Sequence, residues 1–572
     1  MQELLARALA AGKESVVAWA DVLDRINVFP VADGDTGRNL VISLGPLREA
    51  EASFENLSKE LLLSARGNSG NIAARFLSSL LQLNDLDSLI SCCERGRDLA
   101  YGAVKDPKQG TILTLFDVLA KSLKSHPPDE NTPWASLVLE DLEKAVRSTT
   151  DQLPELKEAG VVDSGALGMF VFLEACLHIL VGQEVPFSSM AETLKDSFVL
   201  ADSWSESPDE GYCLDVVLQV EKEGGVDMNQ MSTFGESVVA IPDGEYVKLH
   251  LHTHNEEEVR RRLESVGNVV CWAADDLGEQ TRRFARPRVR QALHIMTDAA
   301  GSVTREDAAG LGITLLDSYI TFGRNSLPET FVDPDRLFET MRKGGKVSTS
   351  QASLFERHQA YNKVLSLHPK VLYLCVGSFY TGNYQAAKDW KDKNDPENRL
   401  ILVDSGVASG RLGLAAIATA RLSLRSADPD EVVTFAKRAV EQCQEIIFLD
   451  KLQWVAAGGR MSKTGAFFGD VFRVKPVVSP TPEGAKKVAV VRSRKEQLQF
   501  ALKRLEDSLP GDQQSTIMLE HTDNKGWVME AVKPELERRF PLADFILQPV
   551  SLTSGAHMGP GTWGVAFLKE ST

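Results

Sequence analysis

The 572-residue sequence contains neither a long apolar run nor a long basic run. A membrane-spanning helix needs roughly 18 or more apolar residues in a row, and no stretch approaches that length. Lys and Arg number 63 against 80 Asp and Glu, so the net charge is −17. Binding of nucleic acid depends on clustered cations. We therefore expect neither a transmembrane segment nor a nucleic-acid partner.

Cysteine is scarce, and familiar catalytic signatures are missing. Seven cysteines, an odd number without the spacing of a disulfide framework, are typical of a reducing compartment. The N-terminus carries acidic residues throughout, which favours an amphipathic helix over a signal peptide. The sequence has no G-x-x-x-x-G-K-[ST] P-loop, no protein-kinase motif set and no G-x-S-x-G nucleophile elbow. A cytoplasmic protein is expected, and any nucleotide site must be built in another way.

The hydrophobic pattern divides this long chain into three parts. Residues 1–182 show helical periodicity with little β-branched alternation, which predicts an all-α bundle. Residues 211–280 alternate like strands around one helix, which predicts a small α+β domain. Strands and helices alternate over residues 291–572, which predicts an α/β domain with ligand loops at the strand ends. The polar stretch 183–210 and the basic stretch 280–291 are interpreted as connections. The fold class is therefore multidomain.

The stretch "NVFPVADGDTGRNL", residues 27–40, places two aspartates one residue apart on a glycine-rich turn. Like charges at this spacing repel, and a common reason for keeping them is a divalent cation between them. Mg²⁺ takes such hard oxygen ligands. We interpret Asp33 and Asp35 as magnesium ligands, with Asn27 as a source of a further oxygen. The alternative is a solvated Asp-Gly turn.

Three further motifs in the helical part interrupt the helical pattern with small or polar residues. "SARGNSGN" places Gly67 to Gly70 between helical runs, where exposed backbone N–H groups at a helix start suit an anion. "VVDSGALG" offers Asp163 or Ser164 as an N-cap, and "QGTILT" contains Thr111. Each of these stretches, taken alone, is also consistent with a plain helix junction.

These four motifs, in this order, resemble the nucleotide-binding domain of the dihydroxyacetone-kinase L-subunit superfamily, and most of all its fatty acid kinase branch. The resemblance implies a barrel-like helical bundle that binds ATP, with Mg²⁺ on Asp33 and Asp35. The sugar-kinase branch carries a third aspartate five residues before the pair, where this chain has Val28. The implied nucleotide contacts are Asn27, Thr36, Asn39, Gly67, Asn68, Ser69, Gly70, Thr111, Asp163, Ser164 and Gly165.

The middle part contains residues of metal-binding type in "YC" and "HLHTH". His250 and His252 project to one face of an extended strand, and Cys213 from a neighbouring strand could complete a zinc site. The alternative is an ordinary polar strand face, and His254 shares the same parity. "GESVVAIPDGEYVKLHLHT" resembles the middle domain of fatty acid kinase, in which a Cys and two His of this kind bind zinc.

The last part carries six small or hydroxyl-rich motifs, most of them after a predicted strand. These are "TDAAGS", "STSQAS", "GSFYTGNYQAA", "VDSGVASGRLG", "GGRMSKTGAFFG" and "GAHMGPGTWGV". Hydroxyl and N–H donors together with Arg460 and His557 suit a carboxylate ligand. Tight turns without a ligand are the alternative.

These six motifs resemble the DegV family of fatty-acid-binding proteins over residues 291–572. The resemblance implies two α/β lobes around one acyl chain, with its carboxylate near Arg460 and His557. By motif, Thr349 or Ser350 would touch the carboxylate, and Thr381 and Gly382 belong to the same site. Ala352 replaces the family's usual Pro, and "TGN" stands where the family usually has "SGT".

The resemblances together imply a fatty acid kinase that converts ATP and a fatty acid into ADP and an acyl phosphate for phospholipid synthesis. A carboxylate with a pKa of roughly 4 to 5 is already ionised at pH 7 and needs no general base. The catalytic set would be Asp33, Asp35, Arg460 and His557. An acyl-phosphate-using acyltransferase would act downstream, and a homodimer and a transient membrane contact are compatible with this function. The alternatives are a kinase of a dihydroxyacetone-like compound and a non-catalytic fatty-acid carrier.

Overall fold

The computed structural model describes residues 1–49, 54–129, 131–188, 190–201, 204, 210–220, 231, 233–279, 291–323, 325–451, 454, 474–509 and 514–569. The chain forms two compact units. The first comprises Met1–Ala285 with His358–Leu367, and the second comprises Arg286–Arg357 with His368–Thr572. In the described part of the chain, no helix has both the length and the apolar character that crossing a bilayer requires.

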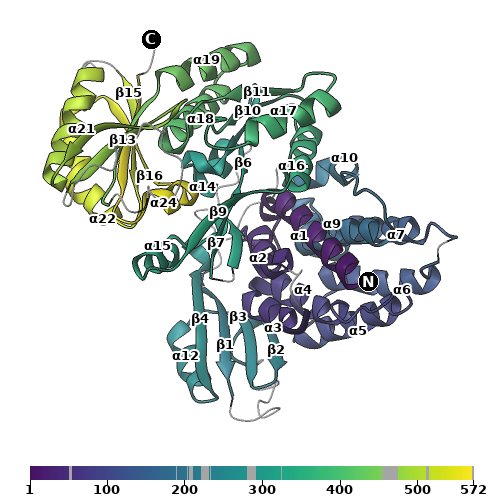
Figure 1. The fold of residues 1–572 in the computed structure, drawn as a ribbon. Helices are drawn as coiled ribbons and strands as arrows, with labels where there is room; N and C mark the ends of the chain where they lie inside the picture. Colours follow the sequence, from purple (N-terminus) through teal and green to yellow (C-terminus); the bar gives the residue numbers. More distant parts are fainter. Residues whose placement is uncertain are drawn as a thin grey trace. The chain divides into compact units, whose positions relative to one another are not determined.

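The N-terminal part of the first unit is a helical bundle around α9, Ser164–Leu180 (Figure 1). This helix is apolar on nearly every side and buried along almost its whole length, which is why it lies at the centre. The long α1, Gln2–Arg25, packs along α9 through an apolar stripe that includes Leu9, Val16 and Leu23. The other elements are α2 (Thr36–Ser43), η1 (Gly45–Glu49), α3 (Phe54–Ser64), α4 (Gly67–Leu80), α5 (Leu89–Ala103), α6 (Ile112–Ser125), α7 (Trp134–Gln152) and α8 (Pro154–Ala159). The predicted all-α bundle is confirmed.

The stretch after α9, expected to be a plain connection, packs partly onto the bundle. It contains the short helices α10 (Met190–Thr193) and η2 (Lys195–Phe198). The rings of Phe187 and Phe198 lie 6.0 and 5.7 Å from the ring of Trp19 on α1. These two phenylalanines stand 11 residues apart among many polar residues and form no hydrophobic periodicity, so the sequence pattern did not predict this packing.

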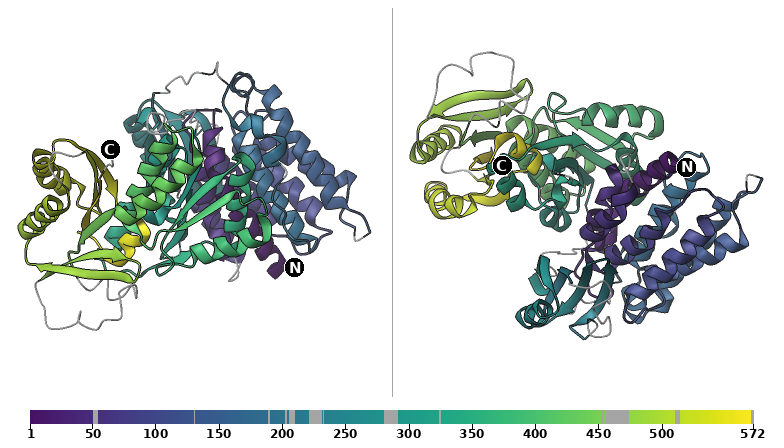
Figure 2. Two further views of the ribbon diagram at one scale, coloured as in Figure 1. Left: turned by 90° about the horizontal axis from the view of Figure 1, so that it is seen from above. Right: turned by 60° about the horizontal axis from the view of Figure 1, so that its bottom comes forward.

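The middle part of the first unit is a four-stranded antiparallel sheet in the order β2-β3-β1-β4. Helix α12 covers one face, where Val259 and Leu263 join the alternate residues Leu214 and Leu249 in a core. The opposite face lies beside the helical bundle (Figure 2), and Lys105 N donates a hydrogen bond to Val238 O there. The elements are β1 (Tyr212–Gln219), β2 (Glu236–Asp243), β3 (Tyr246–Thr253), α12 (Glu256–Glu264) and β4 (Asn268–Asp276). The predicted strands and helix are confirmed, and the basic stretch 280–290 lies outside the described residues.

The described residues of the second unit form three sheets. A parallel sheet has the order β11-β10-β5-β6, and a larger, mostly antiparallel sheet has the order β14-β13-β12-β17-β15-β16. A small antiparallel sheet, β8-β7-β9, completes the unit. The strands are β5 (His294–Asp298), β6 (Ile313–Leu316), β7 (Ser318–Phe322), β8 (Asn325–Pro328), β9 (Val347–Gln351), β10 (Val371–Cys375), β11 (Leu400–Asp404), β12 (Gln444–Phe448), β13 (Lys475–Thr481), β14 (Gly484–Val491), β15 (Ser515–His521), β16 (Ala543–Pro549) and β17 (Trp563–Lys569).

Helix α18 packs against both large sheets. Its small residues, such as Ala415 and Ala416, share one core with Leu372 of the parallel sheet and with Met518 and Ala566 of the larger sheet. The helices and turns are η3 (Ala299–Gly301), α14 (Arg305–Leu311), η4 (Glu329–Phe331), α15 (Pro334–Arg342), α16 (Leu354–Leu367), α17 (Asn383–Asn394), α18 (Ser409–Ser423), α19 (Pro429–Gln442), α21 (Arg494–Ser508), α22 (Lys525–Trp527), η5 (Val528–Val532), α23 (Lys533–Arg539) and α24 (Leu552–Met558). The predicted α/β class is confirmed. The motif "STSQAS", expected as a loop, instead lies largely in the strand β9.

Candidate functional site

A small cavity of about 30 Å³ in the first unit brings together residues that lie far apart in the sequence. This volume holds about two water molecules or ions. The lining comes from the loop before α2, from the start of α4 and from the strands β1 and β3. It consists of Asn27, Phe29, Pro30, Val31, Asp33, Asp35, Thr36, Asn39, Gly67, Asn68, Ser69, Cys213, His250 and His252. The predicted magnesium, phosphate and zinc residues thus meet at one place.

The aspartate loop is shaped by Gly34 and by hydrogen bonds from Asn27. Gly34 has a φ of +68°, a conformation that other residues rarely adopt and that lets both flanking carboxylates line the cavity. Asn27 Nδ2 donates to Asp33 Oδ1 at 2.6 Å and to Val31 O at 3.1 Å. In this arrangement Asn27 turns its amide nitrogen, and not its oxygen, toward Asp33. Its role as a further metal ligand stays a prediction.

The two carboxyl groups are held in a setting that disfavours their charge. Burial raises the pKa of Asp33 to about 6, although hydrogen bonds with Asp35 and Asn27 partly offset this effect. Burial also raises the pKa of Asp35 well above its usual value, and the charges of Asp33 and Asp24 raise it further. A bound cation would remove both penalties, because it favours the ionised form of each carboxylate.

The other helix-start motifs converge just behind this loop. Thr36 Oγ1 donates to Asn27 Oδ1, which also accepts from Ser164 Oγ at 3.3 Å. Asp163 caps α9 by accepting from Ala166 N at 2.7 Å, as predicted for one of two candidate caps. The backbone N–H of Ile112, next to Thr111, also hydrogen-bonds this carboxylate, whose pKa burial raises to about 7. Gly165 lies against Ser69, since a Cβ there would come within 2.8 Å of Ser69 Oγ. All four motifs of the helical part therefore form one cluster.

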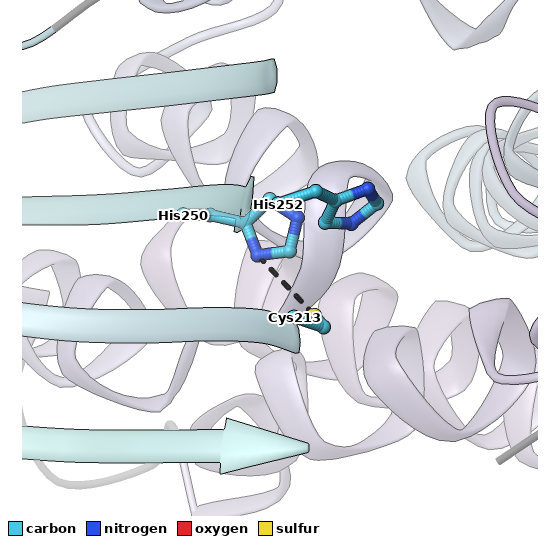
Figure 3. Close-up of side chains that lie close together, drawn as sticks. All are labelled: Cys213, His250 and His252. Carbon is cyan, nitrogen blue, oxygen red and sulfur yellow. Dashed lines mark hydrogen bonds between the residues drawn. The ribbon is translucent and has the colours of Figure 1, made fainter. Parts of the chain in front are cut away.

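Cys213, His250 and His252 form a compact cluster on the sheet face that points at the bundle (Figure 3). Their potential ligand atoms all lie within 4.8 Å of one another. Antiparallel pairing places Cys213 opposite His252 and brings His250 next to it, with Cys213 Sγ 4.0 Å from His250 Nδ1. Buried His250 Nε2 has no hydrogen-bond partner among the described residues. His254, which shares the same parity, is exposed and stands outside the cluster.

The electrostatics of this cluster also suit a cation. Burial raises the pKa of the Cys213 thiol well above its usual value, and the charges of Asp215, Asp35 and Asp33 raise it further. Burial, together with the charge of His250, lowers the pKa of His252 to about 3. An unpartnered ring nitrogen, a thiol and a neutral imidazole are the donor types that Zn²⁺ takes, and three protein ligands leave a fourth position open. The residues present therefore fit a zinc ion.

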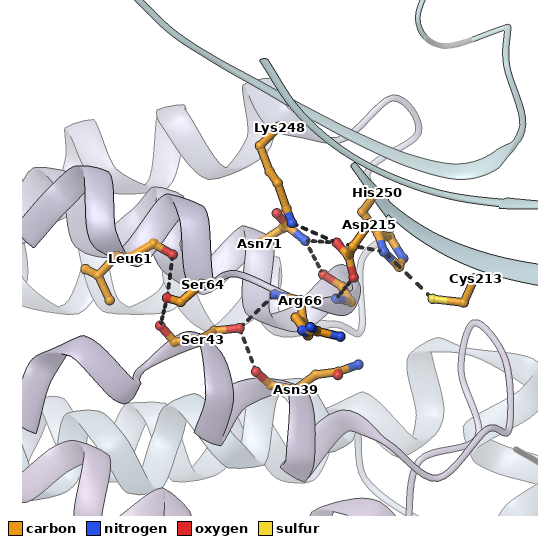
Figure 4. A network of polar contacts seen from close by, with 11 residues as sticks. Asn39, Ser43, Leu61, Ser64, Arg66, Asn71, Cys213, Asp215, Lys248 and His250 are labelled. Atoms are coloured by element: carbon orange, nitrogen blue, oxygen red, sulfur yellow. Dashed lines mark hydrogen bonds and ion pairs between the residues drawn. The ribbon is translucent and has the colours of Figure 1, made fainter. Parts of the chain in front are cut away.

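Two buried charged residues beside the cluster, Asp215 and Lys248, were not predicted as site residues, although Lys248 lies within the stretch "GESVVAIPDGEYVKLHLHT". Both are buried, and both lie on the same face of their strands as the cluster, two residues from Cys213 and from His250 respectively. Figure 4 shows Asp215 between Lys248, His250 and Asn71 of α4. The period-2 rule that predicted the histidine pair would have found both, because charged residues at those positions must face the same side.

A second cluster lies in the second unit, where two predicted carboxylate-binding residues meet. Thr349 Oγ1 on β9 and His557 Nε2 on α24 are 3.1 Å apart. Ser350 is exposed and alternates to the other face of β9, so the geometry favours Thr349 of the two candidates. Gly382 lies near Gln351, since a Cβ on Gly382 would be 3.6 Å from the Gln351 amide. The motifs "STSQAS", "GSFYTGNYQAA" and "GAHMGPGTWGV" are therefore neighbours.

A fourth motif, "TDAAGS", joins this cluster through a buried carboxylate. Asp298 accepts hydrogen bonds from Asn383 Nδ2 at 2.6 Å and from Val376 N at 2.6 Å. Thr381 Oγ1 accepts from Asn383 N at 3.1 Å. Arg357, buried and unforeseen, donates to Gln351 Oε1 at 3.0 Å. Arg460, predicted to bind the carboxylate, lies outside the described residues.

The fold and the two clusters define a helical domain with a partner sheet, followed by an α/β domain built on two large sheets and one small one. Comparison with known families names these parts. Residues 30–178 match the family described as "DAK2 domain", residues 209–284 match a family of fatty acid kinase-like middle domains, and residues 292–570 match "Uncharacterised protein, DegV family". The chain thus combines a DAK2 domain, a fatty acid kinase-like middle domain and a DegV domain, and the predicted combination is confirmed.

Individual relatives match only part of the chain. "Uncharacterized protein SH1689" of Staphylococcus haemolyticus is 31% identical over 313 residues, which are 50% of this chain and 56% of that protein. "Protein YloV" of Bacillus subtilis is 30% identical over 48% of this chain and 55% of its own length. The matches thus span little more than half of these relatives.

Solved structures resemble the DegV part. "Fatty Acid Binding of a DegV family Protein from Thermus thermophilus" has a TM-score of 0.46 and 19% identity and covers 49% of this chain and 99% of its own. "Crystal Structure of DegV, a fatty acid binding protein from Bacillus subtilis" has a TM-score of 0.45 and 19% identity and covers 49% of this chain and 100% of its own.

Proposed function

We propose that this protein is a fatty acid kinase, which transfers the γ-phosphoryl group of ATP to the carboxylate of a fatty acid held by its DegV domain. The observation that carries the proposal is the cavity in which the aspartate loop, the start of α4 and the Cys-His cluster meet. Its position across a DAK2 domain and a fatty acid kinase-like middle domain supports the same function. A DegV domain in the same chain supports a fatty acid as the acceptor.

The roles of the residues follow from their chemistry. Asp33 and Asp35 would hold Mg²⁺, which neutralises phosphoryl charge when it is bound. The loop Gly67–Gly70, at the start of a 14-residue helix, offers backbone N–H groups beyond that of Gly67 which suit the phosphates of the nucleotide. Thr349 and His557 would bind the fatty acid carboxylate, together with Arg460. The carboxylate is already ionised at neutral pH, so the transfer depends on orientation and charge neutralisation and not on a general base.

The Cys-His cluster belongs to the same proposal. Cys213, His250 and His252 would hold Zn²⁺, a Lewis acid that polarises oxygen atoms when it is bound. The contact between His250 Nδ1 and Asp215, 3.5 Å apart, is the carboxylate–histidine arrangement that orients a metal-binding imidazole. This orientation leaves His250 Nε2 as the ligand atom. An acyltransferase that consumes acyl phosphate would act next; a cytoplasmic location, a homodimer and a transient membrane contact stay predictions.

The test identifies the acceptor directly. Lipid extracted from the purified protein is identified by mass spectrometry, and the same fatty acid is then supplied with ATP and Mg²⁺. Acyl phosphate, trapped with hydroxylamine as the hydroxamate, is the expected product.

Two other results would favour the rival functions. ATP consumption with dihydroxyacetone but not with the fatty acid would favour a kinase of small hydroxy or keto compounds. Bound fatty acid without any ATP turnover would favour a carrier. Either result would overturn the proposed function.

A further inference from the structure

Asp215 lies where the metal-binding strands of the middle domain meet the phosphate loop of the helical domain. It follows Cys213 by two residues on β1 and pairs with His250 across the sheet. Its side chain is buried, with 8% of its surface exposed. Burying an ionised carboxylate costs several kcal/mol of folding free energy unless charged and hydrogen-bonding partners compensate it. The partners of Asp215 therefore indicate what this residue does.

The first partners of Asp215 belong to α4. Gly67 N donates to Asp215 Oδ2 at 3.1 Å, and Asn71 Nδ2 donates to Asp215 Oδ1 at 3.2 Å. Asn71 Nδ2 also donates to Gly67 O at 2.7 Å. Arg66, the N-cap residue of α4, makes no side-chain capping hydrogen bond within the described structure. Asp215 therefore caps this helix from a strand 148 residues further along the chain.

The other partners of Asp215 are cationic or belong to the metal cluster. Lys248 Nζ lies 3.4 Å and His250 Nδ1 3.5 Å from Asp215 Oδ1, and both side chains are buried. Lys248, His250 and the two donors of α4 therefore all converge on this one buried carboxylate.

The start of α4 needs such an external restraint. Gly67 has a φ of +62°, and a Cβ there would clash with the side chain of Asn39 on α2, so the backbone makes a tight left-handed turn against α2 that requires glycine. Because Asp215 uses the N–H of Gly67, the N–H groups of the residues that follow are left for a ligand in the cavity, which Asn68 and Ser69 line.

We propose that Asp215 is a positioning residue that sets the phosphate loop Gly67–Gly70 for nucleotide phosphates and ties this loop to the metal-binding strands. The inference rests on the proposed function and assigns a nucleotide polyphosphate as the ligand of the loop. Lys248 balances the charge of Asp215, so that the start of α4 does not present an uncompensated anion to the phosphates. Removal of the carboxylate should therefore weaken nucleotide binding before it affects the rest of the fold.

The experiment measures nucleotide affinity without any fatty acid. A non-hydrolysable ATP analogue with Mg²⁺ is titrated calorimetrically into the full-length protein, into Asp215→Asn and into Asp215→Asn/Lys248→Met. The double variant leaves neither buried charge unpaired, which protects its fold. We expect the Kd to rise about tenfold or more in both variants, since a tenfold change corresponds to about 1.4 kcal/mol, the scale of a lost charge-assisted hydrogen bond.

Hydrogen exchange separates positioning from general stability. In both variants, we expect faster amide exchange in the peptide that covers residues 65–72, with exchange in α6 and α9 unchanged. The control is Glu257→Gln, which removes one carboxylate charge from an exposed position of the same domain and should alter neither readout.

Each other outcome has a defined meaning. An unchanged Kd in the variants, with nucleotide bound by the wild type, overturns this inference alone. A wild type that binds no nucleotide overturns the proposed function and the inference with it. Unfolding of both variants would assign the network a purely structural role, and the inference would be wrong.

Discussion

At the scale of single residues, the aspartate loop shows how function overrides local preference. Asp33 and Asp35 stand close together, and burial penalises the charge of both. Nothing in helix or turn stability favours this arrangement. Such conflicts with local rules concentrate at functional sites, and the proposed divalent cation would resolve this one.

The first prediction concerns Asp35. In Asp35→Asn, hydroxamate formation should fall to background, because an amide is a poor magnesium ligand, while the unfolding temperature is unchanged or higher since one like-charge repulsion is gone. The bound fatty acid should stay. Asp87→Asn, which alters an exposed aspartate of the same domain, serves as the control. Wild-type turnover in the Asp35→Asn variant at saturating Mg²⁺ would exclude Asp35 as a ligand.

The second prediction concerns Glu329, which accepts a hydrogen bond from Thr553 N at 2.9 Å at the start of the helix that carries His557. Burial, with help from the Asp317 charge, raises its pKa from 4.5 to about 8. The folded protein therefore holds one more proton than the unfolded chain between these values. Stability from this group is fully present below pH 4.5 and is lost as the pH rises through 8.

Glu329→Gln, a neutral copy of the protonated acid, should match the wild type at pH 5 and exceed it at pH 9. We expect a difference in unfolding free energy on the order of a few kcal/mol, measured by denaturant unfolding across this range. Glu339→Gln, at an exposed site of the same unit, should show no such pH-dependent gain. Parallel pH curves for Glu329→Gln and the wild type would show that Glu329 is ionised in the folded protein.

At the scale of elements, the β1–β3 pair sets the geometry of the proposed zinc site. Antiparallel pairing with Cys213 opposite His252 brings three potential ligands together from two short strands. A slip of one residue would turn all of them to the other face. The apolar alternation of Leu214, Val216 and Leu249, packed under α12, prevents that slip.

The third prediction follows from this pairing. Elemental analysis of protein purified from zinc-supplemented medium should find about one zinc per chain. Cys213→Ser/His252→Ala should lose it. The matched control, Cys271→Ser/His254→Ala, alters an exposed cysteine and an exposed histidine of the same domain and should keep it. If the wild-type protein contains no zinc under these conditions, the zinc site is wrong and the three residues form an ordinary polar strand face.

At the scale of the whole molecule, the chain separates into two compact units with different predicted tasks. The aspartate loop, the phosphate loop and the Cys-His cluster belong to the first unit, and the Thr349–His557 cluster belongs to the second. Each substrate therefore has its proposed site on a separate unit of one polypeptide.

The fourth prediction tests this division by expression of residues 1–285 and 288–572 as separate proteins, of which the second also contains residues 358–367 of the first unit. The second should retain fatty acid without ATP turnover, and the first should bind ATP and Mg²⁺ but phosphorylate free fatty acid poorly, because orientation supplies much of the barrier reduction. A mixture should regain hydroxamate formation with a dependence on concentration. The intact chain should lack this dependence, because tethering supplies an effective concentration on the order of mM.

Two further results bear on this division of labour. Arg460→Ala/His557→Ala in the intact chain should reduce fatty-acid retention and leave nucleotide binding unchanged, because these substitutions remove charge-assisted hydrogen bonds to the carboxylate alone. Full activity of residues 1–285 alone on free fatty acid would contradict the division and the assignment of the second substrate site.

The sequence by itself determined the class of each domain and most of the residues at the sites. Helical periodicity predicted the bundle, and period-2 alternation predicted the strands of the middle domain, because both patterns are local consequences of backbone geometry. Residue types and spacing indicated the aspartate loop, the phosphate loop and the Cys-His cluster as candidate sites, and the family resemblance supported these interpretations.

Only the tertiary structure decided how these pieces meet. The strand order of the large sheet, the packing of Phe187 and Phe198 on Trp19, and the position of "STSQAS" in a strand all depend on long-range contacts. The same holds for Asp215, which caps α4 from a distance of 148 residues in sequence. No local pattern records such a contact, because its energy comes from the burial of a charge among partners that folding alone brings together.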